Sequence, residues 1–468
     1  MSATTALIFV LAAQTARAES LADAISLAYQ TNPTLQNQRA QLRITNETYV
    51  QARAGYRPQV SATVTGSRQD YQGQTTNTAS ALITASQPLY TGGRTASAVG
   101  AAEADILAGR ETLRQAESNI LQSVVQAYAD VLRDQEGVAI REAALSALSD
   151  QLKEVDARAK VGDLTRTDLA QSQGYLFQAQ LDLASAKAQL EISRASFALA
   201  VGQTPGRLDP LPTLPNLPST LDQAMATAEE GNPSLRSALY AEQAARFRTT
   251  EARDQRLPNV SMQVQIGANG PVSPFLPNIY GRDATVSATF TQPLFAGGVI
   301  NSQVRQQVER QTSARLQTEQ TRRSVIQQIS QAWASFLAAR ENTRNADQGV
   351  SANQVAYEGV QKERRADLRS TLEVLYIEQS LRQAELARAA ARHDAFVNGA
   401  VLLNAMGLLQ ARLLAPDIDV YDPNKAFNDV RYAGAVPWEY VPAALDHVTA
   451  PTLTHLPQPP STLVDPGR

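Results

Sequence analysis

The chain has 468 residues, a formal net charge of -3 and no cysteine. The near-neutral charge leaves no basic surface of the kind that binds nucleic acid, so we expect no nucleic-acid partner. The lack of cysteine excludes disulfides, thiol catalysis and zinc–thiolate sites. Aromatic residues make up only 6% of the chain, which disfavours a large conventional globular core.

The first residues have the features of a secretory signal peptide. An apolar run, Ala6–Ala13, precedes Ala16-Arg17-Ala18, which has small residues at the two positions that signal peptidase reads. We therefore predict a signal peptide over residues 1–18 and a mature chain that starts at Glu19; the alternative is an apolar N-terminus that frays. No later stretch reaches the roughly 18 uninterrupted apolar residues of a membrane helix. If the protein spans a membrane, it does so with strands.

One sequence pattern occurs twice along the chain. Ser86–Arg94 reads SQPLYTGGR and Thr291–Val299 reads TQPLFAGGV, while Asn32-Pro33 before the first copy matches Asn232-Pro233 before the second. A proline-rich stretch separates the two halves, and the residues beyond the second half are proline-rich as well. We predict five parts: a signal peptide (1–18), a first repeat (19–202), a linker (203–218), a second repeat (219–414) and a partly disordered C-terminal tail (415–468).

Each repeat contains two stretches that alternate between apolar and polar residues. Residues 60–65 and 80–86 alternate in the first repeat, and residues 260–266 and 284–290 do so in the second. One face of each stretch is apolar and the other carries small uncharged polar groups, with the period of two that marks a strand. A half-buried strand of a soluble sandwich shows the same alternation. Four paired copies favour the strands of a transmembrane barrel, with lipid outside and water inside.

A long run without proline follows the strands of the first repeat. Between Gly92 and about Lys160, apolar residues recur at spacings of three and four, which predicts a helix of about 67 residues and about 100 Å. A break follows, at which Thr165 and Asp168 have the spacing of a capping box. A second helix over about Thr167–Val201 then folds back along the first.

The second repeat predicts the same helical hairpin. Its long helix starts at about Gly298, breaks near residues 364–369, and is followed by a return helix. Ser370 and Glu373 have the capping-box spacing at the start of this return helix.

The nine-residue pattern stands where a strand must give way to a helix. Proline tolerates a strand end but not a helix interior, and a Gly-Gly pair supplies backbone angles that other residues resist. We therefore interpret the pattern as a hinge between strand and helix. Its residues are Pro88, Gly92 and Gly93 in the first repeat and Pro293, Gly297 and Gly298 in the second.

Four strands in one chain cannot close a membrane barrel. Unpaired backbone groups at an open sheet edge cost several kcal/mol each in a bilayer, and the smallest known membrane barrels have about eight strands. Physical reasoning alone therefore requires at least two copies of the chain.

The Asn-Pro, QPL-x-x-GG and VGDLTRTDLAQSQ segments, in this order between Ser20 and Leu414, resemble the TolC family of outer-membrane efflux and type I secretion channels. The resemblance implies an α+β, mostly α fold. Long antiparallel helical hairpins would form an α-barrel, and each chain would give four strands to a twelve-stranded trimeric transmembrane β-barrel. The implied location is the outer membrane of a Gram-negative bacterium, with a long periplasmic extension.

The resemblance also implies the partners and the mode of action. The chain would form a homotrimer in contact with outer membrane lipid. Its protein partners would be a periplasmic adaptor (membrane fusion) protein and an inner-membrane transporter, either ABC-type or proton-driven. The channel itself would be a passive duct for proteins or small molecules, gated at its periplasmic end.

The resemblance places the gate at the break of the second hairpin. There the family pattern resembles G-L-R-T-T-L-D-V-L-D, and this chain reads DLRSTLEVLY from Asp367 to Tyr376. Arg369 matches an arginine whose bonds help to hold the family's aperture shut, and Glu373 takes the place of the first aperture aspartate. Tyr376 replaces the second acidic position, and Asp168 is the corresponding candidate in the first repeat. Three Glu373 carboxylates around a threefold axis would bind cations and slow conduction, although Glu373 and Asp168 could instead only cap helices.

No residue pattern indicates an enzyme, a cofactor or a metal site. The three histidines, His393, His447 and His455, lie singly, and no metalloprotease, hydrolase or P-loop motif occurs. The competing hypothesis is a periplasmic structural or adaptor coiled-coil protein, whose hairpins pair with another component. The four amphipathic strands and the second hairpin favour the channel.

Overall fold

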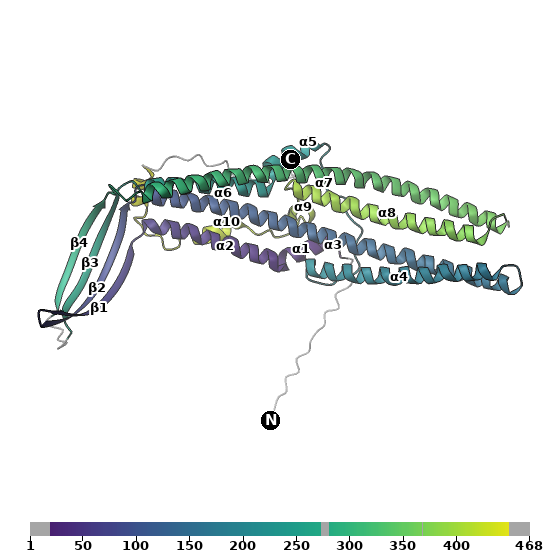
Figure 1. Ribbon diagram of the computed structural model, residues 1–468, viewed down its shortest axis with the longest axis horizontal. Coiled ribbons are helices and arrows are strands. Elements are labelled where there is room, and N and C mark those ends of the chain that lie inside the picture. The colour runs from purple at the N-terminus through teal and green to yellow at the C-terminus, as the bar shows by residue number, and fades with distance from the viewer. Residues whose placement is uncertain (1–18, 273–279, 367, 449–468) are drawn as a thin grey trace, which may run out of the picture. The chain divides into compact units, whose positions relative to one another are not determined.

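A computed structural model describes residues 19–272, 280–366 and 368–448 (Figure 1). The predicted signal peptide over residues 1–18 and the end of the predicted tail, residues 449–468, lie outside the described residues. The described part is mostly helical and contains one four-stranded antiparallel sheet and two long helical hairpins, which confirms the predicted fold class of the single chain. Among the helices that the structure describes, none combines the length and the hydropathy needed to cross a membrane.

Apart from one short 3-10 helix, η1 (Ala54–Tyr56), the two halves of the chain contain the same elements in the same order. The first half consists of α1 (Leu21–Thr31), α2 (Pro33–Arg53), β1 (Gln59–Tyr71), β2 (Gln74–Tyr90), α3 (Arg94–Lys160) and α4 (Arg166–Val201). The second half consists of α5 (Leu221–Gly231), α6 (Pro233–Asp254), β3 (Asn259–Pro271), β4 (Gly281–Thr291), α7 (Val299–Arg365) and α8 (Thr371–Ala405). Three short helices follow: α9 (Ala411–Leu414), α10 (Pro423–Val430) and α11 (Tyr440–His447). The two longest helices, α3 and α7, have 67 residues each.

An Asn-Pro pair separates the two short helices that open each half. Asn32 ends α1, and its Oδ1 accepts hydrogen bonds from the first backbone N–H groups of α2 at 2.9 and 3.3 Å. Asn232 stands at the same place between α5 and α6. Each side-chain amide also donates to the end of a return helix, from Asn32 to the carbonyl of Ala200 and from Asn232 to that of Ala405. The pair therefore stops one helix, starts the next and ties both to the hairpin.

The described residues form two compact units, and each unit takes segments from both halves of the chain. The first, which we call the hairpin unit, comprises residues 19–37, 114–232 and the described part of 324–420. The second, which we call the sheet unit, comprises residues 38–113, the described part of 233–323, and 421–448. The boundaries of the compact units therefore differ from those of the sequence repeats.

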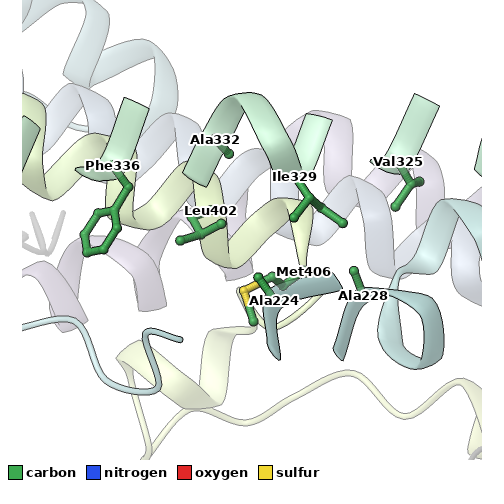
Figure 2. Close-up of a cluster of buried hydrophobic side chains, with 8 residues drawn as sticks. All are labelled: Ala224, Ala228, Val325, Ile329, Ala332, Phe336, Leu402 and Met406. Carbon is green, nitrogen blue, oxygen red and sulfur yellow. The ribbon is translucent and has the colours of Figure 1, made fainter. Parts of the chain in front are cut away.

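Small and apolar side chains from three helices form a core cluster of the hairpin unit (Figure 2). The cluster contains Ala224 and Ala228 of α5, Val325, Ile329, Ala332 and Phe336 of α7, and Leu402 and Met406 at the end of α8. The two alanines are fully buried, and their small side chains let α5 approach the larger residues of α7 closely.

The strands form one sheet in the order β1-β2-β3-β4, in which the pairing of β2 with β3 joins the two halves of the chain. Residues directly opposite each other in an antiparallel ladder lie on the same face, and Ile83 lies between Ala62 and Ile266 in the register. The apolar sheet face therefore contains Val60, Ala62 and Val64 of β1, Ala81, Ile83 and Ala85 of β2, Val260, Met262, Val264 and Ile266 of β3, and Ala284, Val286, Ala288 and Phe290 of β4. The other face carries mainly Ser, Thr and Gln, with Leu82 as an exception. The alternation seen in the sequence is thus continuous across the whole sheet.

His393 of α8 binds two carboxylates inside the hairpin unit. Its Nε2 lies 2.9 Å from Oδ1 of Asp130 on α3, and its Nδ1 lies 2.9 Å from Oδ1 of Asp394. Burial by itself lowers the pKa of His393, but the ionic contact with Asp130 and the hydrogen bond with Asp394 outweigh burial and raise the pKa above its ordinary value. The imidazole therefore joins α3 to α8 most strongly when it is protonated.

We predict that the hairpin unit loses stability as the pH rises through the folded pKa of His393. Because the folded pKa lies above the unfolded value of about 6.5, the contribution is complete below that pH and disappears at higher pH. The melting temperature of the helical signal in circular dichroism should fall by a few degrees between about pH 6 and about pH 8.5. His393→Gln should melt below the parent protein at the lower pH and lose most of this dependence. An equal pH dependence in both proteins would contradict the assignment.

Candidate functional site: the hairpin breaks and the strand-to-helix hinges

The two helical hairpins turn between α3 and α4 and between α7 and α8 (Figure 1). The return helix starts with a capping box in both, so the two breaks share one local design. In the first break, Thr165 Oγ1 accepts from the N–H of Asp168 at 3.2 Å, and Asp168 Oδ2 accepts from the N–H of Thr165 at 3.0 Å. In the second, Ser370 Oγ accepts from the N–H of Glu373 at 3.3 Å, and Glu373 Oε2 accepts from the N–H of Ser370 at 3.0 Å. Both carboxylates thus satisfy backbone donors at the start of a return helix.

The second break also holds two ion pairs, both made by Arg369. Arg369 donates from Nη1 to Oε1 of Glu373 at 3.1 Å and from Nε to Oε2 of Glu363 at 2.9 Å. The structure therefore brings Arg369 and Glu373 into direct contact. Tyr376 lies on the following turn of α8 with 67% of its surface exposed, and the carboxylate of Asp168 is bonded within the first break.

Both capping carboxylates are stabilised in the ionised form. The pKa of Glu373 is lowered by the backbone N–H of Ser370 and then by the guanidinium of Arg369. The pKa of Asp168 is lowered by the hydroxyl and the N–H of Thr165. Each break therefore presents a negative charge at neutral pH, and the charge of Glu373 is partly balanced by Arg369.

A contact that sequence reasoning missed joins the two hairpins close to their breaks. Arg364 at the end of α7 binds Glu154 of α3 through two parallel hydrogen bonds, of 2.9 Å from Nη1 to Oε1 and 3.2 Å from Nη2 to Oε2. A fork of this kind fixes the orientation as well as the distance of its partners. The sequence signal for Arg364 was only a basic residue at a helix end, because its partner lies 210 residues away.

The hairpins also meet along a polar seam further from the breaks. A cavity of about 260 Å³ lies between α3, α4 and α8, lined among others by Arg141, Asp182 and Glu378. Glu378 is 3% exposed, burial raises its pKa, and the nearest guanidinium nitrogen of Arg382 is 3.7 Å away. Charged groups and a cavity therefore lie here beside buried apolar residues such as Leu375, so the contact between these helices is mixed in character.

The two strand-to-helix hinges use left-handed glycines. Gly92 and Gly93 have φ angles of 69° and 82° between β2 and α3, and Gly297 and Gly298 have φ angles of 58° and 85° between β4 and α7. Such angles are unfavourable for residues with a Cβ atom. Pro88 lies in β2 at a register shift, where a missing N–H is tolerated, and Pro293 follows the end of β4.

The same hinge sequence has different surroundings in the two halves. In the first hinge, residues 91–93 are buried, and Asp446 accepts hydrogen bonds from the backbone N–H of Thr91 at 2.7 Å and from its hydroxyl. In the second hinge, Leu294 and Phe295 are 92% and 91% exposed. One hinge is therefore covered by its own chain, and the other presents bare apolar side chains.

Substituting one glycine in each hinge separates backbone strain from crowding. A Cβ at Gly92 would lie 2.8 Å from Cβ of Leu257 and 3.0 Å from the carbonyl oxygen of Pro258, whereas a Cβ at Gly297 would meet no atom within 4 Å. We predict that Gly297→Ala destabilises a single chain by about 1 kcal/mol through its φ angle alone, and that Gly92→Ala costs about 3 kcal/mol because crowding adds to it. Guanidinium unfolding followed by circular dichroism measures both. Equal losses would show that the packing around Gly92 yields.

Comparison with known proteins agrees with this arrangement. Residues 24–203 and 224–408 match the family model described as outer membrane efflux protein. The chain is 33% identical over 433 residues to the outer membrane efflux protein BepC of Brucella suis biovar 1 (strain 1330), covering 90% of this chain and 92% of BepC. It is 22% identical over 415 residues to the outer membrane protein TolC of Escherichia coli (strain K12), covering 84% and 83%. In fold it is similar to the Campylobacter jejuni CmeC outer membrane channel, with a TM-score of 0.75 at 16% identity, covering 88% of this chain and 89% of that one.

Proposed function

The chain belongs to the outer membrane efflux protein family, and from this premise we propose that it forms a trimeric channel that exports proteins or small molecules across the outer membrane and the periplasm. The family assignment places the chain in the outer membrane. BepC is an efflux protein and CmeC a channel, so the resemblance supports transport and not catalysis.

The observation that carries the proposal is an open sheet with one apolar face. β1 and β4 each pair with one neighbour among the described strands, so both have an edge of unpaired backbone groups. The apolar sheet face is exposed at positions such as Val64 and Val286, at 82% and 71%. In lipid the open edges require partner strands, and three copies that pair β4 of one with β1 of the next would close a twelve-stranded barrel.

The exposed second hinge supports the same assembly. The first hinge packs on the loop before β3, where Gly92 meets Leu257 and Pro258. The loop at the same place in the first half precedes β1, at the opposite edge of the sheet from β4. In a ring of copies, the second hinge of one chain, with Leu294 and Phe295, would reach the loop before β1 of the next.

We place the gate of this channel at the hairpin breaks. Three Glu373 carboxylates around the axis would form an anionic ring. Arg369 would partly neutralise the charge of this ring, and Tyr376 would lie one turn further along α8. The Arg364–Glu154 pair would hold the second hairpin on the first in the closed state, and the polar seam would let them part. Asp168 would serve chiefly as a cap. Opening would be driven by a periplasmic adaptor and an inner-membrane transporter, since the duct is passive.

The alternative of a periplasmic adaptor is less well supported. An adaptor would have no use for an exposed apolar sheet face, and the matched family is one of outer membrane efflux proteins. The channel accounts for the sheet, the hairpins and the family match together.

The mass of the complex tests the assembly directly. The protein should be found in the outer-membrane fraction, and the protein mass of the detergent-extracted complex by light scattering should be about 150 kDa, three times the 50.4 kDa chain. A single chain of about 50 kDa in the periplasmic fraction would reject the channel. Cross-linking between cysteines introduced in β1 and β4 provides a second, independent check on the pairing of copies.

Two matched substitutions distinguish a gate residue from a helix cap. Glu373→Gln and Asp168→Asn each weaken a capping box, and Glu373→Gln also removes the ion pair with Arg369, so both should lower helix stability slightly. Only Glu373→Gln should change transport, with a severalfold rise in single-channel conductance and weaker block by divalent cations. Planar-bilayer recordings of both variants and the parent protein measure this. Similar conductance in the two variants would leave Glu373 as a cap alone.

A further inference from the structure

The C-terminal segment Tyr432–Val448 of the sheet unit has an inverted distribution of side chains. Most of its large apolar and aromatic residues face outward and are exposed: Tyr432, Trp438, Tyr440, Val441, Leu445 and Val448. Its two acidic residues face inward, where Glu439 is 3% exposed and Asp446 is fully buried. A helix at a water-exposed surface normally shows the reverse pattern.

The buried acids are held in place by strong contacts. One carboxylate oxygen of Glu439 accepts a hydrogen bond from Nε of Arg53 at 2.8 Å, and the other accepts one from Nε of Arg57 at 3.1 Å. The carboxylate of Asp446 accepts hydrogen bonds from the backbone N–H and the hydroxyl of Thr91. These anchors fix the rotation of α11. Trp438, Val441, Leu445 and Val448, spaced by three, four and three residues, consequently form one outward stripe.

The segment is attached to the base of the apolar sheet face. The indole N–H of Trp438 donates to Oε1 of Gln87 at 3.1 Å. Gln87 follows Ala85 at the strand period of two and pairs with Met262, so it lies on the apolar sheet face at the end nearest the first hinge. Figure 1 shows the yellow C-terminal stretch where the strands meet the helices. The outward stripe is therefore continuous with the surface that faces lipid in the proposed channel.

We propose that Tyr432–Val448 is an interfacial membrane anchor, whose outward stripe lies in the headgroup region of the phospholipid leaflet that faces the periplasm. Trp and Tyr favour this depth because the ring is apolar and its N–H or O–H still meets a polar partner. A short helix with one apolar face binds such an interface while lying in its plane. The proposal rests on the proposed function, since it takes the apolar sheet face to be in lipid.

The two tryptophans of the chain make the test direct. Trp333→Phe leaves Trp438 as the reporter in the full-length protein, reconstituted in vesicles of phosphatidylethanolamine and phosphatidylglycerol. In vesicles whose phospholipids are brominated near the headgroup end of the acyl chains, the emission of Trp438 should fall roughly twofold relative to plain vesicles. Iodide in the aqueous phase should quench it little.

Control variants separate this inference from the channel itself. Trp438→Phe keeps only Trp333 of the hairpin unit, and bromolipid should not quench the emission of Trp333. If Trp333→Phe folds poorly, the emission of Trp438 is obtained instead by subtracting the emission of Trp438→Phe from that of the parent protein. Val286→Trp, in a chain in which both native tryptophans are replaced by phenylalanine, reports on the apolar sheet face. Quenching of this third reporter and of Trp438 by bromolipid supports the anchor.

Three outcomes overturn the anchor. If bromolipid quenches the tryptophan at position 286 while iodide quenches Trp438, the channel stands and the segment lies in water. If neither reagent quenches Trp438, a second copy or another protein covers the stripe. If iodide quenches the reporter at position 286 as well, the sheet is not in lipid, and the proposed channel fails together with the anchor.

Discussion

The pairing of β2 with β3 is the interaction on which the rest of the structure depends. This ladder extends from Thr78 opposite Pro271 to Tyr90 opposite Val260 and makes one sheet from the two halves of the chain. Its register continues the alternation of both strand pairs, so all apolar positions share a face; a slip of one residue would turn half of the sheet over. The same ladder leaves β1 and β4 as outer edges. One set of hydrogen bonds thus defines both the apolar face and the edges at which we propose that copies join.

The duplicated sequence produces two hinges with the same backbone and different environments. Gly92, Gly93, Gly297 and Gly298 all adopt left-handed angles, because the turn from strand to helix is a local requirement. Whether a hinge is covered depends on residues from distant parts of the chain. The first is sealed by the loop before β3 and by Asp446 of the C-terminal segment, while the second shows Leu294 and Phe295 to solvent. An internally repeated chain that covers only one of two equivalent surfaces is suited to assemble with further copies of itself.

The helical hairpins have an apolar core around Ile329 and Leu402 and an ionic contact close to their breaks. Around Ile329 and Leu402 the side chains are buried in one apolar cluster, which holds α5, α7 and α8 together. Towards the breaks, the Arg364–Glu154 fork joins the two hairpins, and buried apolar residues such as Val155 and Val374 lie in the same region. In the proposed channel, the Arg364–Glu154 fork would be the contact that is lost when the ends of the hairpins move apart.

The sequence by itself determined the features whose causes act over a few residues. A period of two placed the four strands, because successive side chains of an extended backbone alternate. The spacing of Thr165 and Asp168, and of Ser370 and Glu373, located the starts of α4 and α8, because a capping box closes over three residues. The Gly-Gly pairs marked the hinges for the same reason.

Only the tertiary structure decided which distant surfaces meet. Arg364 and Glu154 are 210 residues apart, and Trp438 and Gln87 are 351 apart. The proline content of the tail gave no sign that Glu439 and Asp446 would be buried against Arg57 and Thr91. Such pairs leave no periodicity in the chain, because their geometry exists only after the strands have paired and the helices have packed.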